Sequence, residues 1–223
     1  KADSCEKIFT DLPLPIRVMR DHLDEDVEMV VIDNKEEQES VYKFVKNLTP
    51  EFVNKIRFYQ GPPTLFDRFE VDQQIDKALQ QKVQLKSGGT LVIETTEAMT
   101  VVDVNTGKFI GKGGNLEETV TKNNLEAAEE IARQLRLRDL GGIVVIDFID
   151  MILESNREAV MRRLIECLGR DRTKHQVAEV TSLGLVQLTR KRIGQGLIEA
   201  FSTTCDACNG RGIHIHTEPV RAK

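Results

Sequence analysis

The chain has 223 residues, of which 40% are hydrophobic and 30% charged, and a formal net charge of −5. This length allows one large domain or two small ones with a real core, and the composition is ordinary for a soluble globular protein. The longest apolar runs are far shorter than the roughly 20 residues that a transmembrane helix needs. Because the chain opens with Lys1 and shows no signal-like segment, we expect a piece of a longer cytoplasmic protein.

The charge is distributed unevenly along the chain. Acidic residues dominate positions 21–40, whereas basic residues outnumber acidic ones over 157–192. The second half therefore predicts a basic surface on an otherwise acidic molecule. Such a surface is compatible with a polyanionic ligand and also with an ordinary solvated face.

The first third of the chain predicts a compact α/β unit. After the breaker LPLP, residues 16–23 have the pattern of a short helix or strand, and 27–34 that of a buried strand. Residues 35–48 space their apolar side chains at i, i+3, i+4 and i+7, which indicates an amphipathic helix. A short strand with a turn is expected over 54–63, and a second helix over 67–80. None of these segments carries an obvious chemical motif.

A glycine-containing stretch at 87–89 precedes the next group of elements. Residues 90–95 and 99–105 predict two strands joined as a hairpin. The clearest helix of the chain follows after Asn115, whose side chain can cap it together with Glu118. Gly141 and Gly142 end that helix.

Residues 143–151 read as a strand that is apolar on both faces, which favours the middle of a covered parallel sheet. Another helix is expected over 155–172. Residues 176–190 contain two more short strands, and a Cys-x-x-Cys segment closes the fold.

Polar residues interrupt the strand that contains VVDVNTG. Asp103 and Asn105 lie two places apart and therefore point to the same strand face. A carboxylate that faces an apolar layer costs several kcal/mol unless something compensates for it. The same residues also suit a simple turn at the strand end, so a purely structural role stays open here.

A second aspartate is brought close by the predicted β-α-β connection. Such a crossover makes its two strands parallel, so Asp103 and Asp147 are expected at the same edge of the sheet if the strands are neighbours. Two unpaired carboxylates would repel each other, and a divalent cation removes the conflict. We therefore interpret Asp103 and Asp147 as ligands of Mg²⁺, with Asn105 orienting water or substrate. Asp150 is an alternative ligand, although a strand continued to that position would point it to the opposite face.

Three long motifs carry a resemblance to a known family. TEAMTVVDVNTGKF, NLEAAEEIARQLRLRDLGGIVVIDFIDM and LTRKR, followed by Cys-x-x-Cys and GRG, resemble the catalytic half of the ribonuclease E/G family, most closely its actinobacterial-type branch. The similarity runs from about residue 15 to 215. It implies that Asp103 and Asp147 hold a catalytic Mg²⁺, with Mn²⁺ as an alternative ion, and that Asn105 assists.

The resemblance also implies a domain organisation. Residues 1–78 would be part of a ribonuclease-H-like subdomain, 79–199 a DNase-I-like α/β catalytic subdomain, 200–216 a zinc link and 217–223 a tail. The family's S1 RNA-binding domain and most of its 5′-end sensor precede the matching region and are absent from this chain. We therefore expect weak activity from this chain alone.

Several cations are candidates for contacts with RNA phosphates. Where many family members have an arginine that helps to read the RNA 5′ phosphate, this chain has Lys174, which keeps the charge but loses the bidentate fork. The remaining candidates are Lys112 in the glycine-rich loop, Arg172, and the cluster Arg190, Lys191 and Arg192. A solvated surface is the competing interpretation of that cluster.

Cys205 and Cys208 have the spacing of a zinc half-site, which needs two further ligands. His214 and His216 are candidates within the chain, because the alternation in IHIH places both imidazoles on one face. The family resemblance instead implies one structural Zn²⁺ shared by two chains, hence a homodimer and compatibility with a dimer of dimers. A redox dithiol is a third interpretation, although such motifs precede a helix.

The sequence thus predicts a Mg²⁺-dependent endoribonuclease core that cleaves single-stranded RNA in RNA processing and decay, together with RNA-decay partners. The alternative is a non-catalytic module that binds RNA or assembles through zinc. Catalysis would require a metal ion, whereas simple binding would not.

Overall fold

The computed structural model describes residues 11–107, 116–171, 173–178, 185–208 and 210. The chain divides into two compact units, one ending at Asp72 and the other beginning at Gln73. Each unit has its own hydrophobic core. Within the described ranges, no helix has the length and apolarity needed to cross a bilayer.

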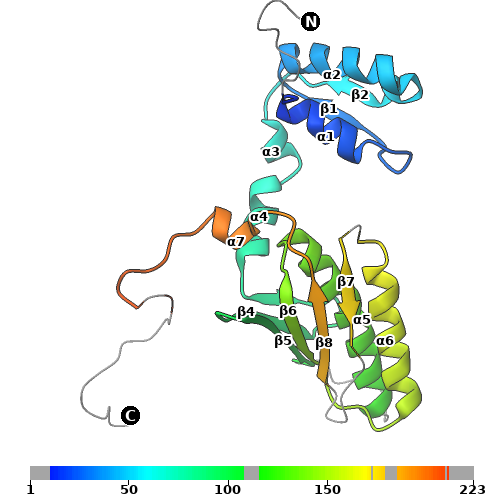
Figure 1. The fold of residues 1–223 in the computed structure, drawn as a ribbon, viewed down its shortest axis with the longest axis vertical. Helices are drawn as coiled ribbons and strands as arrows, with labels where there is room; N and C mark the ends of the chain where they lie inside the picture. Colours follow the sequence, from blue (N-terminus) through cyan, green and yellow to red (C-terminus); the bar gives the residue numbers. More distant parts are fainter. Residues whose placement is uncertain (1–10, 108–115, 172, 179–184, 209, 211–223) are drawn as a thin grey trace, which may run out of the picture. The chain divides into compact units, whose positions relative to one another are not determined.

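The amino-terminal unit is built around a parallel pair of short strands. Its elements are α1 (Leu14–His22), β1 (Val30–Ile32), α2 (Lys35–Leu48), the 3₁₀ helix η1 (Pro50–Lys55), β2 (Ile56–Phe58) and α3 (Leu65–Arg68). β1 and β2 are parallel, with Val30 opposite Ile56, and α2 lies in the crossover between them (Figure 1). The predicted α/β character of this segment is confirmed.

Helix α2 follows the predicted amphipathic pattern. The side chain of Asn34 accepts hydrogen bonds from the backbone N–H groups of Glu36 and Glu37 and so caps the first turn. Val41 and Val45 are fully buried on one side of the helix, whereas Leu48 at its end is exposed. Capping and burial therefore account for the position and orientation of this helix.

The carboxy-terminal unit contains a six-stranded mixed sheet. Its elements are α4 (Val71–Leu79, which spans the division), β3 (Lys82–Gln84), β4 (Thr90–Thr95), β5 (Met99–Asn105), α5 (Leu116–Leu137), β6 (Gly142–Asp147), α6 (Glu154–Leu168), β7 (His175–Val177), β8 (Leu185–Arg190) and α7 (Leu197–Ala200). The strand order is β3-β4-β5-β6-β8-β7. Only β5 and β6 pair in parallel, across the predicted β-α-β connection; the other neighbouring strands of this sheet are antiparallel. The predicted β4–β5 hairpin is confirmed.

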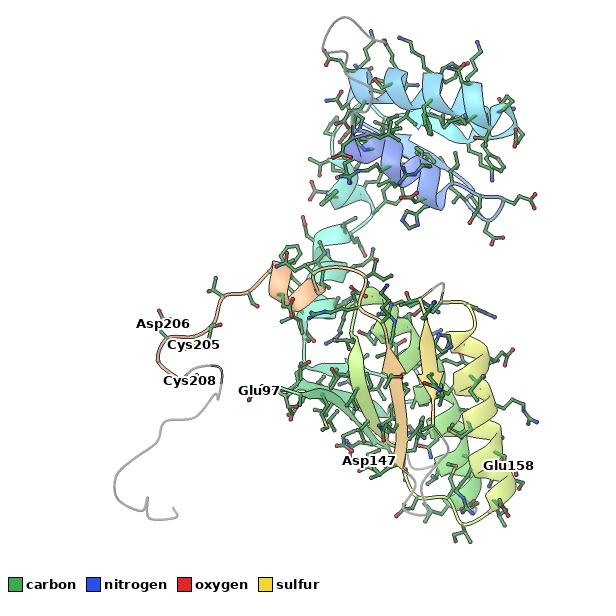
Figure 2. All side chains as sticks on the ribbon, viewed as in Figure 1. Glu97, Asp147, Glu158, Cys205, Asp206 and Cys208 are labelled. Atoms are coloured by element: carbon green, nitrogen blue, oxygen red, sulfur yellow. The ribbon has the colours of Figure 1, made fainter. Side chains whose placement is uncertain are left out.

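The expectation of a covered parallel sheet is wrong. β6 lies between parallel β5 and antiparallel β8. Along β5 and β6 burial alternates, so that Met99, Asp103, Asn105, Ile143 and Asp147 are exposed on one face. Figure 2 shows Asp147 near the end of β6 in this sheet. The apolar run in β6 therefore reflects one buried face and one exposed face with apolar residues on it.

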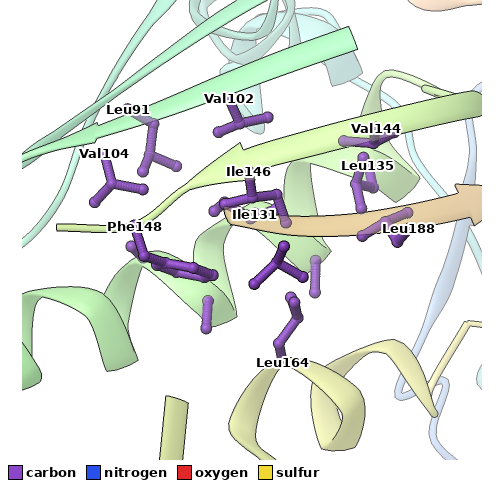
Figure 3. Close-up of a cluster of buried hydrophobic side chains, with 14 of the residues drawn as sticks. Leu91, Val102, Val104, Ile131, Leu135, Val144, Ile146, Phe148, Leu164 and Leu188 are labelled. Carbon is purple, nitrogen blue, oxygen red and sulfur yellow. The ribbon is translucent and has the colours of Figure 1, made fainter. Parts of the chain in front are cut away.

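The opposite face of the sheet forms the main core with α5 and α6. Figure 3 shows Val102 and Ile146 of the sheet facing Ile131 of α5 and Leu164 of α6. These four side chains are essentially inaccessible to solvent. The proposed cap of α5, Asn115, lies outside the described residues. Helices α5 and α6 thus cover one face of the sheet that contains β5 and β6.

Candidate metal centre

Asp103 and Asp147 are directly opposite each other on the parallel strands β5 and β6. Because they are register partners, their side chains leave the sheet on the same face, and neighbouring strands lie only about 4.8 Å apart. Both residues are exposed. The structure therefore brings together the two carboxylates that the β-α-β pattern predicted to be neighbours.

The exposure of Asp103 changes the reason why the two carboxylates need a compensating positive charge. From the sequence we expected this carboxylate to face an apolar layer, but the layer lies on the other side of β5, where Val102 and Val104 are buried. The unfavourable interaction is instead between the carboxylates themselves. Burial, the charge of Asp103 and the charge of Asp150 together raise the pKa of Asp147 above its ordinary value.

Asn105 is tied to the carboxylate pair by a side-chain hydrogen bond. Its amide Nδ2 donates to Oδ2 of Asp103 over 2.8 Å. Both residues lie on the same exposed face of β5. The amide therefore orients the Asp103 carboxylate, whereas the orientation of water or substrate by Asn105 stays a prediction.

Asp150 does not lie on a strand, so it is not held on the opposite strand face from Asp147 as the sequence suggested. Strand β6 ends at Asp147, so alternation along the strand does not extend to Asp150, which lies exposed in the following loop. Its charge contributes to the raised pKa of Asp147. Asp150 is thus close enough to influence the pair electrostatically.

The donor atoms at this edge suit a hard cation. Across the described part of the chain, no group of three or more His, Cys, Asp or Glu side chains is arranged to hold a metal ion. Two carboxylates are nevertheless what Mg²⁺ commonly takes from a protein, because it keeps several positions for water and phosphate oxygens. The exposed pair Asp103 and Asp147, with Asn105 beside it, fits that requirement.

The predicted cation cluster of Arg190, Lys191 and Arg192 does not form one exposed surface. The Arg190 side chain is only 2% exposed, and it forms ion pairs with Asp139 and Asp171 over 2.8 and 2.7 Å. It also donates to the carbonyl of Leu140 and the hydroxyl of Thr173. This arginine links core elements and is not positioned to contact RNA phosphates, contrary to our expectation.

The exposed members of the cluster lie away from the carboxylates. Lys191 and Arg192 are exposed, and Lys174 lies beside them because the Lys191 N–H donates to its carbonyl. In the antiparallel β6–β8 pair, Arg190 is opposite Gly142 whereas Leu185 is opposite Asp147. At about 3.3 Å per residue, the two ends are roughly 17 Å apart along the strands. Lys112 and Arg172 lie outside the described residues.

Comparison with known proteins places the chain in a family. The sequence profile described as the ribonuclease E/G family matches residues 1–193. The chain belongs to the ribonuclease E/G family. It is 43% identical over 206 residues to ribonuclease G of Escherichia coli K12, covering 92% of this chain and 42% of that protein.

Further relatives agree with this membership in the family. Ribonuclease G of Haemophilus influenzae is 44% identical over 206 residues, again with 92% of this chain and 42% of the relative covered. Ribonuclease E of Escherichia coli K12 is 42% identical over 198 residues, which are 88% of this chain and 19% of the relative. The chain thus spans less than half the length of these ribonucleases.

The cysteine pair lies beyond the residues matched by the ribonuclease E/G profile. Cys205 is exposed and Cys208 is half-buried, and a turn includes Cys208. Figure 2 shows both in the extended segment that follows α7. His214 and His216 lie outside the described residues. The zinc half-site at this pair and its remaining ligands both stay a prediction.

Sequence reasoning missed the polar residues of α5 that contact the loops near this site. Asn124 is fully buried and hydrogen-bonded to the backbone of Ile149, two residues after Asp147. Its neighbour Asn123 is also fully buried. Two consecutive asparagines in a helix interior are an unfavourable choice for helix propensity, and that signal was available in the sequence.

Proposed function

We propose that the chain is the core of a Mg²⁺-dependent endoribonuclease that cleaves single-stranded RNA. The observation that carries the proposal is the registered pair of Asp103 and Asp147 on parallel strands, with Asn105 bonded to the first carboxylate. Membership in a family whose relatives are named ribonuclease E and G supports RNA as the substrate. RNA processing and decay in the cytoplasm, with RNA-decay partners, is the proposed setting.

Each residue of the site has a defined task in this proposal. Asp103 and Asp147 would hold the cation, and Asn105 keeps the Asp103 carboxylate oriented toward it. When bound, Mg²⁺ lowers the pKa of a water molecule and neutralises charge on the scissile phosphate. The exposure of the carboxylate pair on the sheet face gives an RNA strand access to this edge.

We propose phosphate contacts for the exposed cations Lys174, Lys191 and Arg192. Because this group is roughly 17 Å from Asp147 along the strands, it would bind phosphates several nucleotides from the cleavage position. Lys112 and Arg172 remain candidates from the sequence. Arg190 is not part of the proposed interface, since its guanidinium is buried between two carboxylates.

The finer domain description is likewise part of the proposal. The parallel β1–β2 pair with its helices supports a fragment of a ribonuclease-H-like subdomain, and the mixed sheet backed by α5 and α6 supports a DNase-I-like catalytic subdomain. The segment with Cys205 and Cys208 would be the zinc link. The family similarity supports these subdomain assignments more strongly than the strand order alone does.

Cleavage of RNA should depend strictly on a divalent cation. A labelled single-stranded RNA incubated with the chain and Mg²⁺ is expected to be cut internally, and chelation by EDTA should stop cleavage while leaving part of the RNA binding intact. A fully duplex RNA of the same sequence serves as the control and should resist cleavage. High enzyme concentrations are needed because the chain spans only 42% of ribonuclease G. RNA binding without cleavage at any Mg²⁺ concentration would indicate the non-catalytic alternative.

Zinc is expected to join two chains through Cys205 and Cys208. Two thiolates fill half of a tetrahedral site, and a symmetry-related chain supplies an identical pair. Metal analysis should give half a zinc ion per chain, and light scattering should give a dimer that chelation converts to monomer. Cys205→Ser should have the same effect, whereas Cys167→Ser on α6 should leave the dimer intact. One zinc ion per chain in a monomer would point to His214 and His216 instead.

A further inference from the structure

Helix α5 carries polar side chains that contact the loops near the carboxylate pair. Near its start, the Glu117 carboxylate accepts hydrogen bonds from the backbone N–H groups of Ile152 and Leu153. Further along, the Glu126 carboxylate accepts from the N–H groups of Lys86 and Ser87. Asn123 and Asn124 lie between these two contacts and are both fully buried.

Asn124 holds the chain immediately after β6. Its Nδ2 donates to the carbonyl of Ile149 over 2.7 Å, and its Oδ1 accepts from the Ile149 N–H over 3.2 Å. One side chain thus satisfies both backbone groups of a residue two positions beyond Asp147. This contact fixes the direction in which β6 ends.

Asn123 packs against Gly89, which lies beside the end of β5. A Cβ added to Gly89 would lie 2.0 Å from Oδ1 of Asn123 and 2.9 Å from the backbone oxygen of Asn105. The side chain of Asn123 therefore packs against Gly89, whose position in turn lies close to the backbone oxygen of Asn105 at the end of β5. Thr90, which follows Gly89, is the register partner of Asn105.

These asparagines are unfavourable for the helix that contains them. Asparagine is a weaker helix former than alanine or leucine, and among the described residues neither the Nδ2 nor the Oδ1 of Asn123 has a hydrogen-bond partner. An unsatisfied buried polar group destabilises a fold, because it loses its hydrogen bonds to water and gains none in return. An apolar side chain would serve packing better at both positions, so the contacts with Gly89 and Ile149 are the features that favour these asparagines.

We propose that Asn123 and Asn124 are positioning residues that set the spacing between Asp103 and Asp147. Neighbouring positions on one helix contact the chain beside both strand ends: Asn123 meets Gly89 next to Asn105, and Asn124 bonds Ile149 after β6. The helix thereby couples the two strand ends to each other. The inference rests on the proposed function, because the spacing matters when both carboxylates bind one cation.

The test is Mn²⁺ binding by the purified chain without RNA, measured by titration calorimetry. Asn124→Leu keeps the side-chain volume but removes both hydrogen bonds, and should weaken Mn²⁺ binding about tenfold, the lower end of the effect of removing a group that orients a metal ligand. Gln134→Met is the matched control: Gln134 is another buried amide of α5, bonded to Arg138 and Glu130 away from the carboxylates. It should destabilise the fold without changing Mn²⁺ affinity.

A second variant acts from the other strand end without touching α5. Gly89→Ala pushes against Asn123 and the backbone of Asn105, and should also weaken Mn²⁺ binding about tenfold. Gly194→Ala, where an added Cβ meets nothing within 4 Å, is its control. RNA cleavage by the Asn124→Leu and Gly89→Ala variants should recover at high Mg²⁺, and circular dichroism without metal should show both variants folded, which separates lost metal affinity from a folding defect.

The outcomes separate this inference from the proposed function. Wild-type Mn²⁺ affinity in both Asn124→Leu and Gly89→Ala would overturn the positioning role, and so would an equal loss in Gln134→Met. If Asp103→Asn also binds Mn²⁺ like the wild type, the metal centre itself is misassigned. If Asp103→Asn abolishes binding while the other two variants do not alter it, the metal centre stands and the positioning role alone fails.

Discussion

Replacing Asp103 or Asp147 with asparagine is expected to reduce Mg²⁺-dependent RNA cleavage by more than about a hundredfold. Removing a group that merely orients a metal ligand lowers metal affinity or activity by about 10–100-fold, and these aspartates would be the ligands themselves. A neutral amide binds a hard cation poorly and does not offset its charge. Single-turnover cleavage of a labelled single-stranded RNA measures the effect.

The same variants should fold normally, because both carboxylates are exposed. Burial and the charge of Asp103 both raise the pKa of Asp147. Each substitution removes one of the two neighbouring charges, so without metal the melting temperature should equal or slightly exceed that of the wild type. The stabilisation that Mg²⁺ gives to the wild type should disappear. Asn105→Ala should lose less activity than either, because it removes the hydrogen bond to Asp103 but neither carboxylate.

Asp150→Asn provides the matched control for charge. Asp150 is exposed and raises the pKa of Asp147 electrostatically, but it lies in the loop beyond the registered pair. We expect its activity to fall by less than about tenfold, below the effect of removing an orienting group. A large loss in Asp150→Asn combined with near-normal cleavage by Asp147→Asn would reassign the second ligand to the loop.

Local patterns predicted the elements that carry this site. The strong periodicity of the helix after 115, the alternation in β5 and the rule for β-α-β crossovers together placed Asp103 and Asp147 at one sheet edge. The prediction succeeded because it needed only the identity of two strands and one connection. The pairing Asp103 with Asp147 confirms that β5 and β6 are neighbours.

Pairing of distant strands lay beyond these local patterns. Nothing local in the apolar segment after Gly142 indicates that β8 would pair with it in the antiparallel direction. A covered parallel strand and a strand with one exposed apolar face can have the same run of aliphatic residues. The exposed Ile143 belongs to the second kind.

The alternation of buried and exposed residues along β8 indicates that Arg190 is buried, but its position beside two other cations favoured a surface cluster. Val186 and Leu188 are buried on one face of β8, and Arg190 continues the same alternation toward the core. Grouping it with Lys191 and Arg192 as a cluster ignored that period of two. Its partners Asp139 and Asp171 come from other segments, so the compensation for its charge required the tertiary structure.

Arg190→Met should therefore destabilise the carboxy-terminal unit by about 3 kcal/mol, the lower end of the effect of removing one partner from a buried ion pair. The lower end applies because Asp139 keeps hydrogen bonds from the N–H groups of Ile193 and Gly194. For a unit of this size the melting temperature should fall by roughly 6–12 °C. Arg163→Met, which removes a partly exposed arginine paired with Glu129, should have a much smaller effect.

The stability lost in Arg190→Met should decrease as the pH falls. Burial alone would raise the pKa of Asp171, but the hydrogen bonds from Arg190 and Thr173 and the charge of Arg190 together outweigh it, so the folded-state pKa lies below the unfolded value. A depressed pKa contributes stability that is present above the unfolded value of about 3.9 and lost as pH falls through the folded value. The difference between the wild type and Arg190→Met should therefore be largest near neutral pH and shrink in acid.

A second substitution tests whether the carboxylate of Asp171 causes the instability of Arg190→Met. Adding Asp171→Leu to Arg190→Met should recover part of the stability, because it removes the buried carboxylate left without its arginine.

The salt dependence of RNA binding should be unchanged in Arg190→Met but flatter in a Lys191→Ala/Arg192→Ala variant, since only exposed cations displace counterions from RNA. A wild-type melting temperature together with a flatter salt dependence in Arg190→Met would instead assign that guanidinium to the RNA-binding surface and contradict its buried ion pairs.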